Sequence, residues 1–183
     1  MKGAIGLGLL VGIVGSIFLP HVFAALNNEG FKTFALSISM ITSNQPAGLA
    51  GLFSAGFPEP IPGAGMFGYN PNIIGLFTLP PTNTFLFYYP AMLSWLVCGL
   101  LSALFSQSIK KGVLSATVFI IVEVLLYMLM KVIAGKSIGE VILIDGSALT
   151  FIGGAIITPV GFSILGGLLG GLISRAAFGP EEI

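Results

Sequence analysis

The chain has 183 residues, of which 55% are hydrophobic and only 8% carry charge, and its mean hydropathy is +1.04. Because soluble globular domains carry about 25% charged residues, this composition excludes that class and predicts a single integral membrane domain over residues 1–183. Seven basic and seven acidic residues give zero formal net charge, without a basic run that would bind nucleic acid or anionic lipid. One cysteine, Cys98, excludes an intrachain disulfide and a CxxC metal or redox motif.

Four apolar segments approach or exceed the roughly 20 residues that a helix needs to cross a bilayer. We therefore predict an all-α membrane protein with four transmembrane helices, at residues 3–26, 90–107, 113–133 and 149–173. The second helix could begin as early as Phe85, and Pro159 predicts a kink in the fourth. The first segment also resembles a cleavable signal peptide, but the apolar residues that continue after Pro20 and His21 favour a retained anchor.

The basic residues near the ends of these segments predict the orientation of the chain. An arrangement with both termini in the cytoplasm of a multi-pass cell-membrane protein puts Lys2, Lys110, Lys111 and Arg175 inside. Lys32, Lys131 and Lys136 then lie outside, so the bias rests mainly on the short SQSIKKG loop between the second and third helices.

Small residues at four-residue spacing predict the faces where helices pack, since helices in lipid associate through close van der Waals contact. Three of the four segments carry such residues: Gly8, Gly12 and Ser16 in the first, Ser94, Cys98 and Ser102 in the second, and Gly166, Gly167, Gly170 and Gly171 in the fourth. The GxxxG pairs of the fourth segment could serve the chain's own bundle or a neighbouring subunit.

Residues 27–88 form a long extracytoplasmic segment that is rich in proline and aromatic residues and poor in charge. This composition predicts a folded cap rather than a disordered linker, packed on the chain itself, on the membrane or on partner subunits. FALSISM, which ends at Met40, alternates with period two and predicts a short strand. PAGLAGLFSAGF, which starts at Pro46, predicts an interfacial or re-entrant helix. NIIGLFTLPP predicts another short strand or an apolar lip, and EVILID predicts a small strand or a continuation of the interface.

The third transmembrane segment holds the candidate site, because Glu123 lies near its middle, where an ionised carboxylate costs a few kcal/mol or more. Tyr127 and Lys131 follow at i+4 and i+8 and share one helical face with it, and Phe119 and Ser115 extend the stripe inward. The stripe could carry a proton, hold a cation or orient a polar ligand. A structural alternative is a neutral Glu123 that joins helices through Tyr127, Ser94, Ser102, Thr158 or another chain.

No motif predicts catalysis, a metal or another cofactor, since GxSxG, HExxH and phosphate-binding loops are missing and His21 is the single histidine. A metal site of His21 with Glu29, Glu59 or a methionine is the weakest of the readings. We therefore expect a non-catalytic accessory or structural subunit of a larger membrane complex, in contact with lipid and with other subunits or copies of itself. The alternatives are a small transporter or channel subunit that uses the Glu123–Tyr127–Lys131 stripe, and a module that binds a lipid or small apolar ligand.

Overall fold

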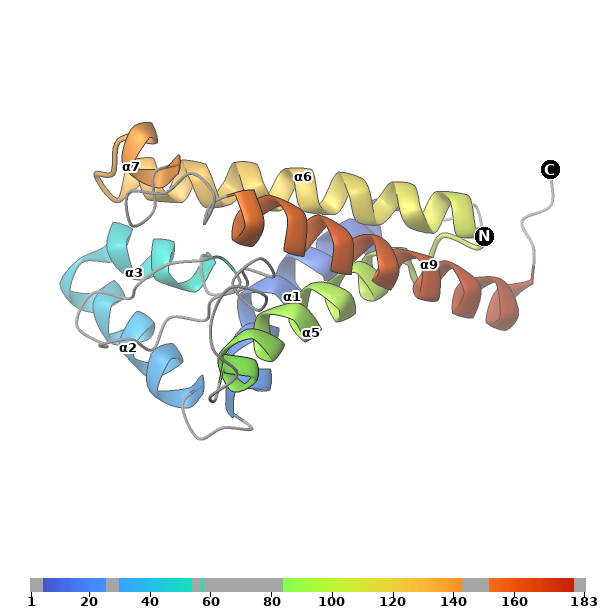
Figure 1. Cartoon of the computed structure of the whole chain (residues 1–183), viewed down its shortest axis with the longest axis horizontal. Coiled ribbons are helices and arrows are strands. Elements are labelled where there is room, and N and C mark those ends of the chain that lie inside the picture. The colour runs from blue at the N-terminus through green and yellow to red at the C-terminus, as the bar shows by residue number, and fades with distance from the viewer. Residues whose placement is uncertain (1–4, 26–29, 54–56, 58–83, 143–151, 180–183) are drawn as a thin grey trace.

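The computed structural model describes residues 5–25, 30–53, 57, 84–142 and 152–179, and the regular structure within them is entirely helical. Its long helices are α1 (Ile5–Ala25), α5 (Thr84–Ala103), α6 (Ile109–Ile133) and α9 (Thr158–Phe178). Three shorter helices, α2 (Gly30–Ser43), α3 (Gln45–Phe53) and α7 (Ile138–Ile142), gather at one end of this body (Figure 1). The prediction of an all-helical chain is thus confirmed for the described residues.

Three helices are long and apolar enough to cross a membrane, namely Ile5–Phe23, Ile109–Ile133 and Ile152–Phe178. In α5 the described apolar stretch is shorter and runs from Tyr89 to Ala103. This helix ends four residues before Gln107, where the second segment was predicted to end. Beyond the helix, Gln107 adopts the left-handed region at φ 55°, and its N–H donates to Oγ of Ser174 at 2.9 Å.

The four long helices alternate in direction along the chain. Gly8 of α1 lies against Ser102 of α5, whereas Gly15 lies beside Cys98, so these two helices are antiparallel. The same reasoning makes α6 and α9 antiparallel, since Gly171 meets Ile109 and Gly167 meets Ala116; they lie side by side in Figure 1. Helices α5 and α6 each pack against the other three long helices.

The two GxxxG pairs of α9 face two different helices of the same chain. Gly166 and Gly170 lie against the backbone of α5, where an added Cβ would collide with the carbonyl oxygens of Leu96 and Leu100. Gly167 and Gly171 lie against α6, where an added Cβ would come within 2.6 Å of Ala116 and 2.9 Å of Ile109. All four glycines are therefore used for packing inside the bundle, which the sequence had left open.

Two further glycines, which the four-residue spacing did not predict, lie in the same contacts of α9 with α5 and α6. An added Cβ on Gly99 of α5 would collide with the backbone of Ser163, and one on Gly112 of α6 would lie 2.6 Å from the carbonyl oxygen of Gly167. In α1, Gly8 and Gly12 both face Ser102. Glycine thus occurs on both sides of the α5–α9 and α6–α9 contacts, which lets the backbones approach closely.

Pro159 lies in the first turn of α9, directly after a π-helical stretch, η2 (Ile152–Ile157). The hydroxyl of Thr158 donates to the carbonyl oxygen of Gly153 at 2.7 Å across this junction. The helix type therefore changes at the position where the sequence predicts a kink.

The strand predicted for FALSISM is wrong, because these residues lie inside α2. An alternation over seven residues also places Phe34 and Ile38, and Leu36 and Met40, at the i, i+4 spacing of a helix, so the pattern is ambiguous. EVILID is also not a strand over its described part, which belongs to α7. NIIGLFTLPP lies outside the described residues.

The helix predicted from Pro46 onward is confirmed as α3. Its Gly48 lies so close to the backbone of Ile41 in α2 that an added Cβ would collide there, so these two short helices form a compact pair. Helix α3 also contacts α6, and this joins the pair to the end of the bundle.

Helix α7 begins with a capping box. The N–H and hydroxyl of Ser137 donate to Oε2 of Glu140 at 2.7 and 2.9 Å, and the N–H of Glu140 donates back to Oγ of Ser137 at 3.3 Å. These donors, and to a smaller degree Lys136, hold the pKa of Glu140 below its ordinary value. Since the folded pKa is the lower one, this contribution to stability is present above the pKa of the unfolded chain and is lost as pH falls through the folded pKa.

We predict that Ser137→Ala raises the pKa of Glu140 toward its ordinary value, because the variant loses the hydroxyl that donates to Oε2 and that accepts the return bond from the Glu140 N–H. The Glu140 side-chain carboxyl resonance, followed by NMR through an acid titration, gives the measurement. Lys136→Gln is the control and should shift the pKa less. An equal or larger shift in Lys136→Gln would contradict the cap as the main cause.

We predict that Gly166→Ala destabilises the bundle by about 1–3 kcal/mol, since its Cβ would overlap the backbone of α5. Gly161→Ala on the same helix is the matched control, because no atom lies within 4 Å of its Cβ position. Thermal unfolding in detergent compares the two variants. If both unfold like the parent chain, α5 and α9 do not pack as described.

Candidate functional site

One face of α6 carries a row of buried side chains that includes two ionisable groups of opposite charge. At successive i+4 positions it presents Ser115, Phe119, Glu123, Tyr127 and Lys131, and all five are buried. The opposite face exposes large apolar side chains: Leu114, Val118, Ile121, Leu125 and Leu129. Helix α6 therefore turns its polar groups into the bundle and its apolar side chains outward, as suits a helix in lipid.

Glu123 is the most deeply placed charged side chain among the described residues, with 1% of its surface exposed. Its Oε1 lies 2.8 Å from Oγ of Ser16 in α1, and the same Oγ lies 2.7 Å from the carbonyl oxygen of Ile13. Its Oε2 is buried and has no hydrogen-bond partner within the described part of the chain. The carboxyl group thus contacts α1 through one oxygen only.

The partner of Glu123 is not one of the four that the sequence suggested. Three of those hydroxyls instead donate to helix backbone: Ser94 to Pro90 O, Ser102 to Gly99 O and Thr158 to Gly153 O. The sequence assigned Ser16 to the packing stripe of α1, because it follows Gly8 and Gly12 at the same four-residue spacing. That spacing does not indicate that its hydroxyl pairs with Glu123. Only the packing of α1 on α6 reveals that it faces the carboxyl group.

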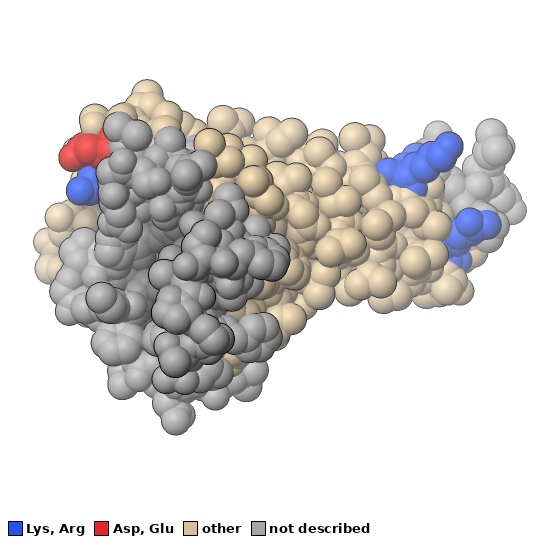
Figure 2. All heavy atoms as spheres, viewed as in Figure 1, with Lys and Arg blue, Asp and Glu red and all other residues tan. Residues whose placement is uncertain are grey.

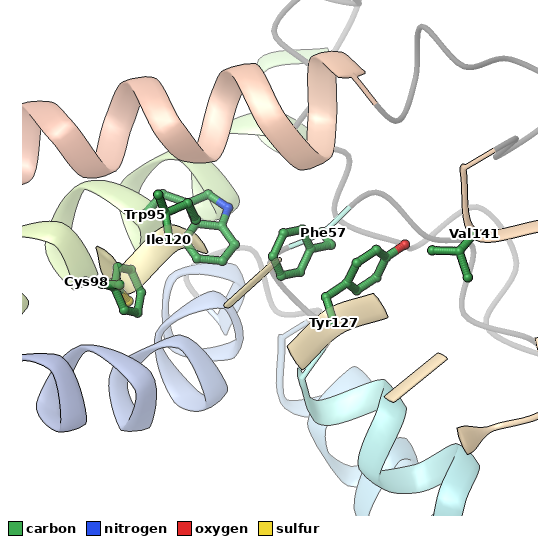
Figure 3. Close-up of a cluster of buried hydrophobic side chains, with 7 residues drawn as sticks. Phe57, Trp95, Cys98, Ile120, Tyr127 and Val141 are labelled. Carbon is green, nitrogen blue, oxygen red and sulfur yellow. The ribbon is translucent and has the colours of Figure 1, made fainter. Parts of the chain in front are cut away.

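An aromatic cluster lies on either side of Glu123 along α6. Tyr127 stacks on Phe57 with ring centroids 4.4 Å apart, Phe57 meets Trp95 at 4.9 Å, and Trp95 meets Phe119 at 6.2 Å. Figure 3 shows Phe57 between Trp95 and Tyr127, with the Tyr127 hydroxyl directed away from it toward Val141 of α7. The rings of this cluster thus link α5, α6 and Phe57 at the positions one turn before and one turn after Glu123.

Lys131 ends the row, in the last turn of α6. Its side chain is 6% exposed, and its Nζ lies 5.8 Å from the centre of the Tyr127 ring, a cation–π geometry. A cation in the last turn of a helix also interacts favourably with the negative end of the helix dipole. The predicted Glu123, Tyr127 and Lys131 stripe is therefore buried throughout, with Glu123 turned toward α1 and Lys131 held over an aromatic ring.

Cys98 and His21 are buried in the bundle. Cys98 belongs to the apolar cluster around Trp95, which fits its reading as a packing residue, and His21 is buried near the end of α1. The described residues contain no group of three or more His, Cys, Asp and Glu side chains that could hold a metal. Glu29 and Glu59, the carboxylates considered beside His21, lie outside the described residues.

The exposed charged side chains that the structure describes lie at the two ends of the body. Lys110 and Lys111 begin α6 and Arg175 lies in the last turn of α9, so the antiparallel packing of these helices brings the three together. Lys136 and Glu140 follow the other end of α6. Figure 2 shows blue basic groups at one end, red and blue groups together at the other, and uncharged described residues between them. Glu123 therefore lies buried within the uncharged zone.

Comparisons with protein-family models, curated proteins and solved structures found no match to this chain.

We predict that Phe57→Ala shifts the fluorescence of Trp95, the single tryptophan of the chain, to longer wavelength and makes it more accessible to a water-soluble quencher. Loss of the buried ring should also cost about 3–5 kcal/mol of stability. Phe178→Ala is the control, since that ring is 62% exposed at the end of α9. Unchanged emission in Phe57→Ala would contradict the position of Phe57 between Trp95 and Tyr127.

Proposed function

We propose that the chain is a small transporter or channel subunit, in which Glu123 is the group that binds the transported ion, proton or small polar solute. The observation that carries this proposal is a carboxyl group, 1% exposed in the middle of an apolar helix, with one oxygen on Ser16 and the other without a partner in the described residues. Ionisable groups at this depth are costly, and their usual role is in ion or proton pathways.

The proposal includes four transmembrane helices, with α5 as the fourth span beside α1, α6 and α9, and an extracytoplasmic segment between α1 and α5. It places the end with Lys110, Lys111 and Arg175 in the cytoplasm, by the excess of basic residues there, and the chain in the cell membrane. Glu123 is the fifteenth residue of the 25-residue helix α6, which supports a position near the middle of the bilayer.

In this proposal the described conformation is a closed one. Oε1 of Glu123 faces Ser16 of α1, so separation of α1 from α6 would admit water to the carboxyl group. The contact that would have to break includes the Ser16–Glu123 hydrogen bond. Lys131 would then serve the outer end of the route, where its charge influences which solutes approach.

A second candidate is a non-catalytic accessory or structural subunit of a larger membrane complex. What favours it is that α1, α6 and α9 each leave a row of large apolar side chains exposed, which fit a neighbouring subunit as well as lipid. The close-packing glycines of α9 lend it no support, because they are occupied by α5 and α6 of the same chain.

The decisive experiment is transport by the purified chain in liposomes, with Glu123→Gln as the test and Glu140→Gln as the matched control. We expect the parent chain and Glu140→Gln to move protons or small cations, and Glu123→Gln to fall to the rate of protein-free vesicles. Equal transport by Glu123→Gln and the parent chain would contradict a role for the carboxyl group. Native mass measurement after gentle extraction tests the second candidate, which requires stable partner proteins.

A further inference from the structure

The hydroxyl of Ser16 lies within hydrogen-bond distance of two oxygens at once. It is 2.7 Å from the carbonyl oxygen of Ile13 and 2.8 Å from Oε1 of Glu123. A serine hydroxyl has one hydrogen to donate and two lone pairs that accept, whereas a backbone carbonyl can only accept. The protonation of Glu123 therefore decides whether both short contacts can be hydrogen bonds.

If Glu123 were ionised, both neighbours of Ser16 would be acceptors, and they would compete for a single hydrogen. One contact below 3 Å would then join two oxygens without a proton between them. If Glu123 is a neutral acid, its own O–H donates to Ser16 and the Ser16 hydroxyl donates to Ile13. The second arrangement gives each short contact a proton, and buried polar groups are normally paired in this way.

The other oxygen of Glu123 leads to the same result. Oε2 is buried and no donor reaches it within the described residues. For an ionised carboxylate this would leave an oxygen that carries about half of a negative charge unpaired in an apolar bundle, which is among the costliest arrangements in a protein. For a neutral acid Oε2 is an uncharged carbonyl oxygen, and the penalty is much smaller.

The buried titratable groups on the helices around Glu123 do not change the number of donors available to its two oxygens. Helix α1 contributes His21, α5 contributes Cys98, and α6 contributes Tyr127 and Lys131. None of them donates to either oxygen of Glu123, since Ser16 is the partner of Oε1 and Oε2 has none in the described part of the chain. The stretches α3 and η2 contain no titratable residue, and the buried polar side chains of α9, Thr158, Ser163 and Ser174, do not titrate.

We infer that the species bound by Glu123 is a proton, and that the chain of hydrogen bonds from Glu123 through Ser16 to Ile13 is complete only while that proton is present. This inference rests on the proposed function, because it names the ion for the same site. Loss of the proton leaves one hydrogen for two acceptors and a buried charge, so it favours separation of α1 from α6. A metal cation would need several more oxygen ligands around the carboxylate than the described residues place there.

The experiment is infrared spectroscopy of the parent chain in lipid at neutral pH, compared with Glu123→Gln and Glu140→Gln. We expect the carbonyl band of a protonated carboxylic acid, sensitive to exchange into heavy water, which persists in Glu140→Gln and is missing in Glu123→Gln. Ser16→Ala should shift the band, and Ser16→Thr, which keeps the hydroxyl, should restore it. A folded parent chain in which the Glu123 band is that of an ionised carboxylate overturns the inference.

Glu123→Gln suits this comparison because its amide N–H can donate to Ser16 as the neutral acid does, so we expect the variant to fold. The infrared result is also independent of transport. A protonated Glu123 in a chain that moves nothing across liposomes would support the proton site and overturn the transporter. An ionised Glu123 in a chain that moves another cation, and stops doing so in Glu123→Gln, would overturn the proton and support the transporter.

Discussion

The close approach of helix backbones through glycine is the constraint on which the rest of this structure depends. Helices in lipid gain little from the hydrophobic effect on pairing, so they rely on contacts that only small residues allow. Gly166 and Gly170 bring α9 onto α5, and Gly167 and Gly171 bring the same helix onto α6. Helix α9 thereby fixes α5 and α6 relative to each other. The polar row of α6 faces into the bundle, where Glu123 meets α1 through Ser16.

The same close packing decides how polar side chains are satisfied. Most of the buried hydroxyl groups donate to a backbone carbonyl, either in their own helix, as Ser102 does, or across a contact, as Ser115 does to Ser102 and Ser163 does to Trp95. Such bonds need no second side chain and leave the bundle apolar. Glu123 differs, because its one partner is the side chain of Ser16. Like the bonds of Ser115 and Ser163, this contact depends on the relative position of two helices. In our proposal the pairing of the carboxyl group depends in addition on its own proton.

Much of the site could be predicted from the sequence because helical spacing is local. Apolar length marked three of the helices that could cross a membrane, and the i, i+4 rule placed Glu123, Tyr127 and Lys131 on one face of α6. Local patterns failed where they were short. Seven alternating residues in α2 satisfied both a strand and a helix, and Pro159 carried no information about the π-helical turn before it.

The sequence by itself thus determined that the chain is apolar, helical and provided with a carboxylate inside one helix, because composition and periodicity are properties of neighbours along the chain. Only the tertiary structure decided that Ser16 is the partner of Glu123, that Phe57 stacks on Tyr127, and that the glycines of α9 serve its own bundle. Ser16 and Glu123 are 107 residues apart, so their contact depends on how α1 meets α6. No pattern within either helix contains that information.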